Sequence, residues 1–299
     1  MVNHSDDAAN AYYNLNEAGD IDLLPIDADD GLLSTKETTE VRINYGLYKS
    51  SAELLFSYGF LNAHTSCQWL SLPLPSSPLD PLTPAKERIL HSPPTVKLID
   101  LPSPLSIAWL SAEIWLLITN AEDGLEFKVL QQTDGSQELV LYWRDDTDVE
   151  EGVLVDDMDT LRRCLEKSDL WEVFHLRAIV TLQQIVTDKL QQLDESEEIF
   201  TTILESAKRS STEGQTGTVE HQGEMREGVV ALARELRERE RRLLTKSITW
   251  FEEEKERLVK MEVIQGYLAK AQEGQEGQEE QEGQEGQGEG GEEEEEDFS

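Results

Sequence analysis

Three short stretches near the N-terminus bring together residue types that could do chemistry. Asn3 and His4 form an adjacent pair of hydrogen-bonding side chains. Tyr45 ends an alternating stretch typical of a strand, and Tyr58 and Phe60 flank a glycine. Such side chains can hydrogen-bond to a bound molecule or stack against it. Taken one at a time they fit structural roles equally well, as a turn histidine, a half-buried strand tyrosine and core aromatics at a helix end.

The order and close spacing of the three stretches are more specific than any one of them. They are Val2–Ser5, Glu40–Gly46 and Ser51–Phe60. Together they resemble the SET family, and within it the Rubisco large-subunit methyltransferase-like group. That group shows an Asn-His-Ser motif, a strand ending in Tyr-Gly, and a helix of the form Glu-Leu-Leu…Tyr-Gly-Phe. The resemblance directly covers about residues 1–62.

The resemblance implies a fold, a cofactor and a role for each site residue. The implied fold is α+β: a small β-rich part of a SET domain, then a mainly α-helical substrate-binding domain. The Gly/Gln/Glu repeats at the end of the chain add a disordered acidic tail by their composition. The implied cofactor is S-adenosyl-L-methionine (AdoMet), held by Asn3 and His4. Tyr45 matches the catalytic tyrosine, and Tyr58 and Phe60 match aromatics of the substrate channel.

Methyl transfer to lysine makes demands that such a site could meet. A lysine ammonium has a pKa of roughly 10.4 and no lone pair with which to attack a methyl group. A dry channel walled by aromatic rings lowers that pKa, because it desolvates the positive charge. Alignment of amine, methyl and sulfur then supplies much of the rate. The tyrosine hydroxyl of Tyr45 would position the amine.

The sequence departs from the family pattern ahead of the Asn-His pair. SET domains carry an N-terminal half with a Gly-x-Gly loop, which binds much of AdoMet. No such half precedes the Asn-His pair in this sequence, and the Gly-x-Gly triplets at 286–290 lie in low-complexity repeats without a strand before them. We therefore expect a protein-lysine N-methyltransferase that is incomplete in this chain. The alternative is a non-catalytic helical interaction protein with a vestigial SET segment. AdoMet binding distinguishes the two.

Periodicity and turn signals predict the elements around these motifs. Ala11–Leu15 and Ile21–Ile26 are predicted to form a hairpin, and Ser50 with Glu53 forms a capping box that begins a helix. Apolar residues from 106 to 130 recur at helical spacing. Leu170–Leu204 is the longest amphipathic signal, typical of a core helix.

A second charged helix over Arg226–Gln272 is a candidate hairpin partner for the Leu170–Leu204 helix. A coiled-coil assembly through these two helices is a further alternative that rests on periodicity alone.

The predicted division of the chain has six parts. They are 1–64, the C-terminal part of a SET domain; 65–104, a Pro-rich connection with one short helix; 105–208, a helical substrate-binding domain; 209–223, a flexible loop; 224–272, a charged helix; and 273–299, a disordered acidic tail.

The net charge of −36 limits the classes of partner. Nucleic acid would be repelled, so we expect no nucleic-acid partner, and a basic protein substrate is favoured. No run reaches the roughly 18 apolar residues of a membrane helix. Cys67 and Cys164 lie outside any metal-ligand spacing, so no metal site is predicted. With two cysteines and no signal-peptide pattern, the predicted location is the cytoplasm or the nucleus.

Overall fold

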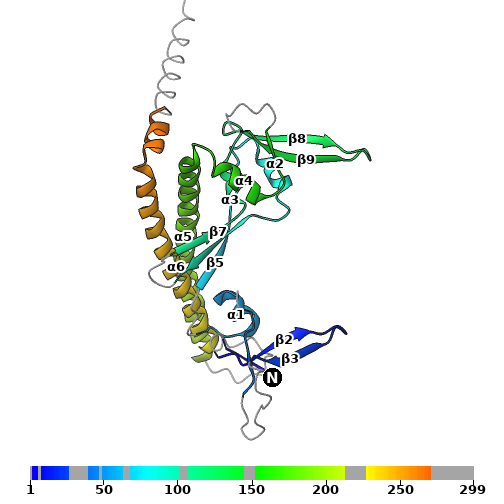
Figure 1. The fold of residues 1–299 in the computed structure, drawn as a ribbon. Coiled ribbons are helices and arrows are strands. Elements are labelled where there is room, and N and C mark those ends of the chain that lie inside the picture. The colour runs from blue at the N-terminus through cyan, green and yellow to red at the C-terminus, as the bar shows by residue number, and fades with distance from the viewer. Residues whose placement is uncertain are drawn as a thin grey trace, which may run out of the picture. The chain divides into compact units, whose positions relative to one another are not determined.

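The structure is a computed structural model, and it describes residues 2–5, 8–26, 40–46, 49–62, 68–101, 107–144, 152–212 and 227–270. The chain forms two compact units, each built from three separate segments. Unit 1 comprises Met1–Leu72, Lys97–Leu110 and Val186–Ser247. Unit 2 comprises Pro73–Val96, Ser111–Ile185 and Ile248–Ser299. Figure 1 colours the elements by their position in the sequence.

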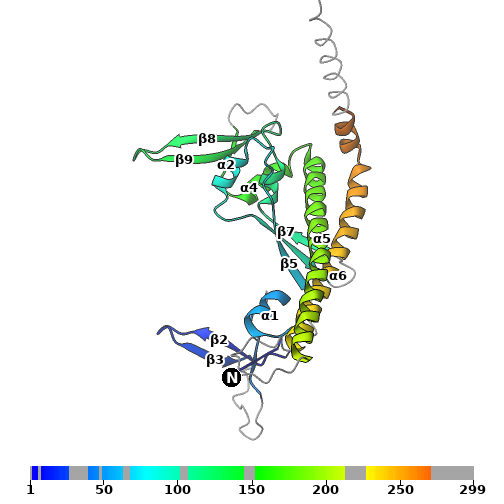
Figure 2. The ribbon, with the colours of Figure 1, turned by 180° about the vertical axis from the view of Figure 1, so that it is seen from behind.

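Unit 1 begins with four short strands and one helix: β1 (Asn3–His4), β2 (Ala11–Leu15), β3 (Ile21–Pro25), β4 (Arg42–Ile43) and α1 (Ser51–Tyr58). Strands β2 and β3 pair antiparallel as the predicted hairpin, drawn as two blue arrows in Figure 2. Strands β1 and β4 pair parallel, with Asn3 opposite Arg42, although the two strands are remote in the sequence.

Helix α1 begins and ends where local chemistry predicts. The Ser50 hydroxyl accepts a hydrogen bond from the Glu53 N–H at 3.1 Å, and the Glu53 carboxylate accepts from the Ser50 N–H at 2.6 Å. Two of the unpaired donors at the helix start are thereby satisfied. Gly59 ends the helix with a φ of 77°, a left-handed conformation that costs glycine little. The predicted capping box is confirmed.

A three-stranded sheet follows α1, in the order β5 (Gln68–Pro73), β6 (Thr95–Asp100) and β7 (Ile107–Leu110). Two of these strands lie in the Pro-rich segment 65–104, which was predicted to be a connection with one short helix. Most of its prolines lie between β5 and β6, where no ladder hydrogen bond is needed. Strand β7 also corrects the helical interpretation at Ile107 and Leu110, where pairing with β6 outweighed a three-residue apolar spacing. Residues 114–118 of the same segment are helical, as expected.

Unit 2 contains the remaining short elements: α2 (Thr83–Ile89), α3 (Ile114–Ile118), β8 (Leu125–Gln131), β9 (Gln137–Trp143), β10 (Val153–Val155) and α4 (Met158–Leu165). Strands β8 and β9 form a long hairpin (Figure 1) in a sheet of order β10-β9-β8. Residues 125–131 were also expected to be helical. The overlooked signal is Asp134-Gly135, because Gly135 takes a φ of 85° in the turn that joins the two strands.

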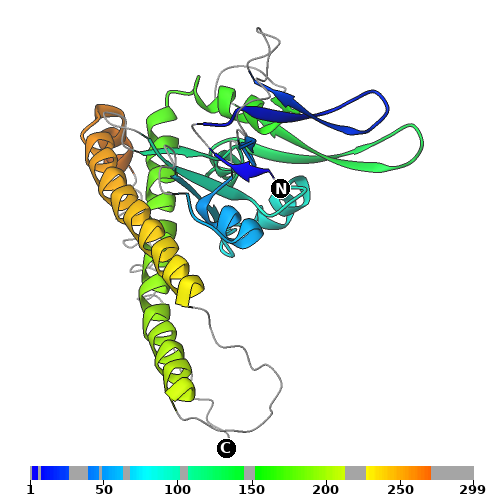
Figure 3. The same ribbon diagram turned by 90° about the horizontal axis from the view of Figure 1, so that it is seen from below.

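Two long helices complete the chain: α5 (Trp171–Thr212) and α6 (Glu227–Val259), followed by helical residues 262–270. The predicted helices over Leu170–Leu204 and Arg226–Gln272 are confirmed at these positions. The two run side by side in Figure 3 as an antiparallel pair. In unit 1 the Arg237 guanidinium donates to the Leu193 carbonyl at 2.7 Å, and in unit 2 the Lys255 ammonium donates to Gln183 at 2.8 Å.

The α+β class is confirmed, and the domain boundaries remain a prediction. Helix α5 continues to Thr212, into the segment 209–223 that was expected to be a loop. The rest of that segment and the tail 273–299 lie outside the described residues. Among the helices that the structure describes, none combines the length and the apolar character needed to cross a membrane.

His175, on α5, gives unit 2 a pH-dependent contribution to stability. Its ring stacks on Trp171 at 5.8 Å, and burial lowers the pKa of the imidazole below its ordinary value of 6.5, against an opposing effect of Glu254. The unfolded chain therefore binds the proton more readily than the folded one. The contribution of the neutral His175 ring to stability is fully present above about pH 6.5. It is lost as the pH falls below that value and through the lowered pKa of the folded protein.

We expect the free energy of unfolding of the wild type to fall more between pH 7.5 and pH 5.5 than that of a His175→Phe variant. Urea unfolding at the two pH values measures both. The variant keeps an aromatic ring against Trp171 and lacks only the titration. Equal losses in the two proteins would contradict the assignment.

Candidate functional site

The five residues predicted to form the site line one open hollow of about 730 Å³ in unit 1. They are Asn3, His4, Tyr45, Tyr58 and Phe60. The first two come from β1, the third follows β4, and the last two lie on either side of the glycine that ends α1. Residues far apart in the sequence are thus brought to one place.

The pairing of β1 with β4 brings the Asn-His pair to Tyr45. In the parallel register Asn3 lies opposite Arg42 and His4 opposite Ile43. The Ser5 N–H donates to the Ile43 carbonyl at 3.1 Å, which extends the pairing past the two strand residues. Because Tyr45 comes two residues after β4, it lies beside His4.

Tyr45 contacts β1 through both its backbone and its side chain. Its N–H donates to Nδ1 of His4 at 3.1 Å, so a neutral His4 ring carries its proton on Nε2. The Tyr45 hydroxyl donates to the Val2 carbonyl at 2.5 Å. These two hydrogen bonds orient the tyrosine and the imidazole relative to each other.

The rings form an aromatic wall around Tyr45. The centroid of Tyr45 lies 4.6 Å from that of Tyr58 and 5.1 Å from that of His4, and His4 lies 5.3 Å from Phe60. Gly59 makes this possible, since its left-handed turn changes the chain direction between Tyr58 and Phe60. The Lys49 ammonium lies over the Tyr58 ring, 5.9 Å from its centroid, so a cation is already present near this wall.

The rim of the hollow is polar and includes three residues that the sequence analysis did not select: Glu40, Arg42 and Ser57. The Asn3 amide donates to the Glu40 carboxylate, and Arg42 pairs with the same carboxylate at 2.7 Å. The hydrogen bonds from Asn3 and then Arg42 lower the pKa of Glu40. An ionised Glu40 therefore orients Asn3. Only the register of β1 on β4 reveals this, because no local motif joins the three residues.

Comparison with known proteins shows what this sequence is similar to. No protein-family model matches the chain. The chain is 30% identical over 174 residues to SET domain-containing protein 8 of Schizosaccharomyces pombe, an alignment that covers 57% of this chain and 37% of that protein. The chain therefore spans little more than a third of the length of this relative.

A solved structure, that of Rubisco LSMT bound to sinefungin and monomethyllysine, aligns with a TM-score of 0.38 and 18% identity. The alignment covers 87% of this chain and 50% of that one. The sequence match bears out the predicted resemblance: over the aligned part, the chain is similar to a SET domain-containing protein.

Proposed function

We propose that the protein is an AdoMet-dependent protein-lysine N-methyltransferase and that this chain carries part of its active site. The observation that supports this most is the convergence of Asn3, His4 and Tyr45 on one hollow with an aromatic wall. Relationship to a SET domain-containing protein supports the same reaction class.

The hollow suits AdoMet in its chemistry. AdoMet supplies a methyl group on a positively charged sulfur, and the faces of the Tyr45 and Tyr58 rings attract positive charge. The polar rim formed by Asn3 and Glu40 suits the polar ends of the same molecule. In this proposal Asn3 and His4 hold the cofactor.

The residues of this chain would act on the acceptor lysine by desolvation and alignment. The rings of Tyr58 and Phe60 would desolvate the ammonium and lower its pKa from roughly 10.4, so that it gives its proton to bulk water and gains a free lone pair. The Tyr45 hydroxyl would accept a hydrogen bond from the neutral amine and direct it at the methyl group.

A basic protein is the proposed substrate. A net charge of −36 attracts lysine-rich proteins over several ångströms and raises their rate of encounter. The same charge disfavours nucleic acid.

Removal of the His4 ring provides a test of the cofactor site. The His4→Ala substitution, introduced into the native protein in its own cells, should lower the affinity for AdoMet on the order of tenfold. The Tyr45 N–H loses its hydrogen-bond acceptor, and the imidazole ring that forms one wall of the hollow is gone. Isothermal titration calorimetry measures the affinity. His91→Ala, at an exposed histidine of unit 2, is the matched control and should bind as the wild type does.

A native protein that neither binds AdoMet nor transfers its methyl group to any lysine would overturn the proposal. The helical interaction protein with a vestigial SET segment would then be the better description.

A further inference from the structure

Unit 2 contains a sheet edge that is only partly covered. Strand β10 has three residues and β9 has seven. The register places Val153 opposite Trp143 and Val155 opposite Leu141, so β10 covers only one end of β9. Among the described residues, no strand pairs with 137–140 on that side.

The hydrogen-bond pattern identifies which backbone groups are open. At the turn the Gln132 N–H donates to the Ser136 carbonyl, and at the base the Arg144 N–H donates to the Gly124 carbonyl. Because ladder hydrogen bonds alternate along an antiparallel pair, residues 138, 140 and 142 bond to β8. The backbone N–H and C=O of Gln137 and Leu139 therefore point to the open side, where nothing in the described part of the chain pairs with them.

A hollow of about 770 Å³ lies along this edge. Its lining includes apolar residues of both strands, among them Leu139, Leu141 and Leu154. The end of α2 with the residues that follow it (88–92) and the start of α4 also line it, as do Glu113 and Leu130. The open backbone groups thus lie beside a surface that could hold alternate side chains of an added strand.

The hollow is acidic. Its lining includes four carboxylates and one arginine: Glu113, Glu138, Asp156, Asp157 and Arg88. Hydrogen bonds from the side chain and backbone of Thr160 hold the pKa of Asp157 below its usual value, so that carboxylate is charged at neutral pH. A strand added here would meet a net negative surface, which favours lysine and arginine and disfavours a second copy of this acidic chain.

We propose that the open edge of β9 binds an extended, lysine- and arginine-rich segment of a partner protein, which adds to the sheet in line with β10. The segment exchanges backbone hydrogen bonds with Gln137 and Leu139. Its basic side chains face the carboxylates of the hollow. The inference does not rest on the proposed methyl transfer, because it is argued from the open edge of β9 and the charges beside it in unit 2, and the aromatic hollow belongs to unit 1.

A proline substitution tests the backbone contact. Leu139→Pro removes the outward N–H and leaves the bonds of residues 138 and 140 to β8. Leu139→Val keeps the N–H and is the matched control. The probe is a fluorescein-labelled peptide of alternating lysine and valine, titrated into the full chain by fluorescence anisotropy. We expect Leu139→Pro to bind about tenfold more weakly than Leu139→Val.

The comparison between these two variants is the readout, because the acidic tail 273–299 attracts any basic peptide to the same extent in both. Glu138→Gln combined with Asp156→Asn should weaken binding at low salt and reduce its salt dependence. Equal affinity of the proline and valine variants would overturn the proposal.

Hydrogen exchange of the wild type gives a second test that needs no variant. Bound peptide should slow exchange of the amides of Gln137 and Leu139, while the amides of 138 and 140 are already protected by β8. Unchanged exchange at Gln137 and Leu139 under saturating peptide would overturn the proposal even if the proline variant failed to fold.

Discussion

Tyr45→Phe in the native protein should lower the rate of methyl transfer by about 10²–10³-fold and leave the affinity for AdoMet nearly unchanged. The substitution keeps the ring, so the contacts of Tyr45 with Tyr58 and His4 are retained. It removes the hydroxyl, which is proposed to align the amine, together with the hydrogen bond from that hydroxyl to the Val2 carbonyl. A group that acts on the reacting amine affects the rate more than cofactor binding.

The measurement pairs the rate of transfer of labelled methyl groups to lysine with AdoMet binding by calorimetry. Tyr12→Phe, at an exposed tyrosine of β2, makes the same chemical change away from the hollow and should leave both values unchanged. A Tyr45→Phe protein with full activity would remove Tyr45 from its proposed role. A loss of AdoMet binding equal to the loss of rate would instead make it a cofactor-binding residue.

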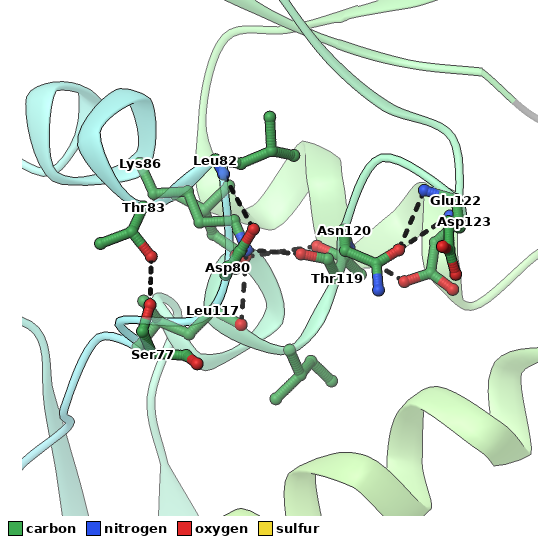
Figure 4. A network of polar contacts seen from close by, with 12 residues as sticks. Ser77, Asp80, Leu82, Thr83, Lys86, Leu117, Thr119, Asn120, Glu122 and Asp123 are labelled. Carbon is green, nitrogen blue, oxygen red and sulfur yellow. Dashed lines mark hydrogen bonds and ion pairs between the residues drawn. The ribbon is translucent and has the colours of Figure 1, made fainter. Parts of the chain in front are cut away.

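Lys86→Met should destabilise unit 2 by about 3–5 kcal/mol. The Lys86 side chain is 2% exposed, and its ammonium lies 2.5 Å from a carboxylate oxygen of Asp80, itself 14% exposed. The same ammonium donates to the Thr119 carbonyl at 2.5 Å and, more weakly, to the Leu117 carbonyl at 3.4 Å (Figure 4). One buried cation thus joins α2 to the end of α3.

The cost of the substitution comes mainly from the groups left behind. Methionine fills most of the space of Lys86, but Asp80 keeps a largely buried charge without its cation, and the Thr119 carbonyl loses its donor. Asp80→Asn combined with Lys86→Met should therefore be less destabilised than Lys86→Met alone. The free energy of unfolding in urea gives both values.

Lys260→Met is the matched control, because that side chain is 77% exposed and its pairing with Glu256 is loose. It should change the free energy of unfolding by no more than about 0.5 kcal/mol. A Lys86→Met protein as stable as this control would show that the buried ion pair does not hold α2 in place.

Local features of the sequence were sufficient to predict an element where the residues that stabilise it lie within the same short segment. The capping box of Ser50 and Glu53 and the glycine at position 59 predicted both ends of α1. Apolar periodicity predicted α5 because a helix of this length repeats its pattern many times. The order of the three N-terminal motifs was enough to select Asn3 and Tyr45 as site residues.

Short strands could not be predicted in the same way. Ile107 and Leu110 are three residues apart, a spacing that fits a helix, yet they belong to β7 because β6 offers a partner. Phe127 belongs to β8 for a similar reason, since Gly135 turns the chain back to form β9. In such segments a few apolar residues fit both the helical and the strand period. Whether a distant strand is available for pairing decides which element forms.

Residue types and their local order thus determined which side chains of this protein are candidates for chemistry, together with both ends of helix α1. Tertiary structure alone decided that β1 lies on β4, which brings His4 to Tyr45 and Asn3 to Glu40. It alone also buried Lys86 against Asp80 and left the edge of β9 open. The physical reason is that capping and periodicity act within a few residues, whereas strand pairing and burial depend on partners that are remote in the sequence.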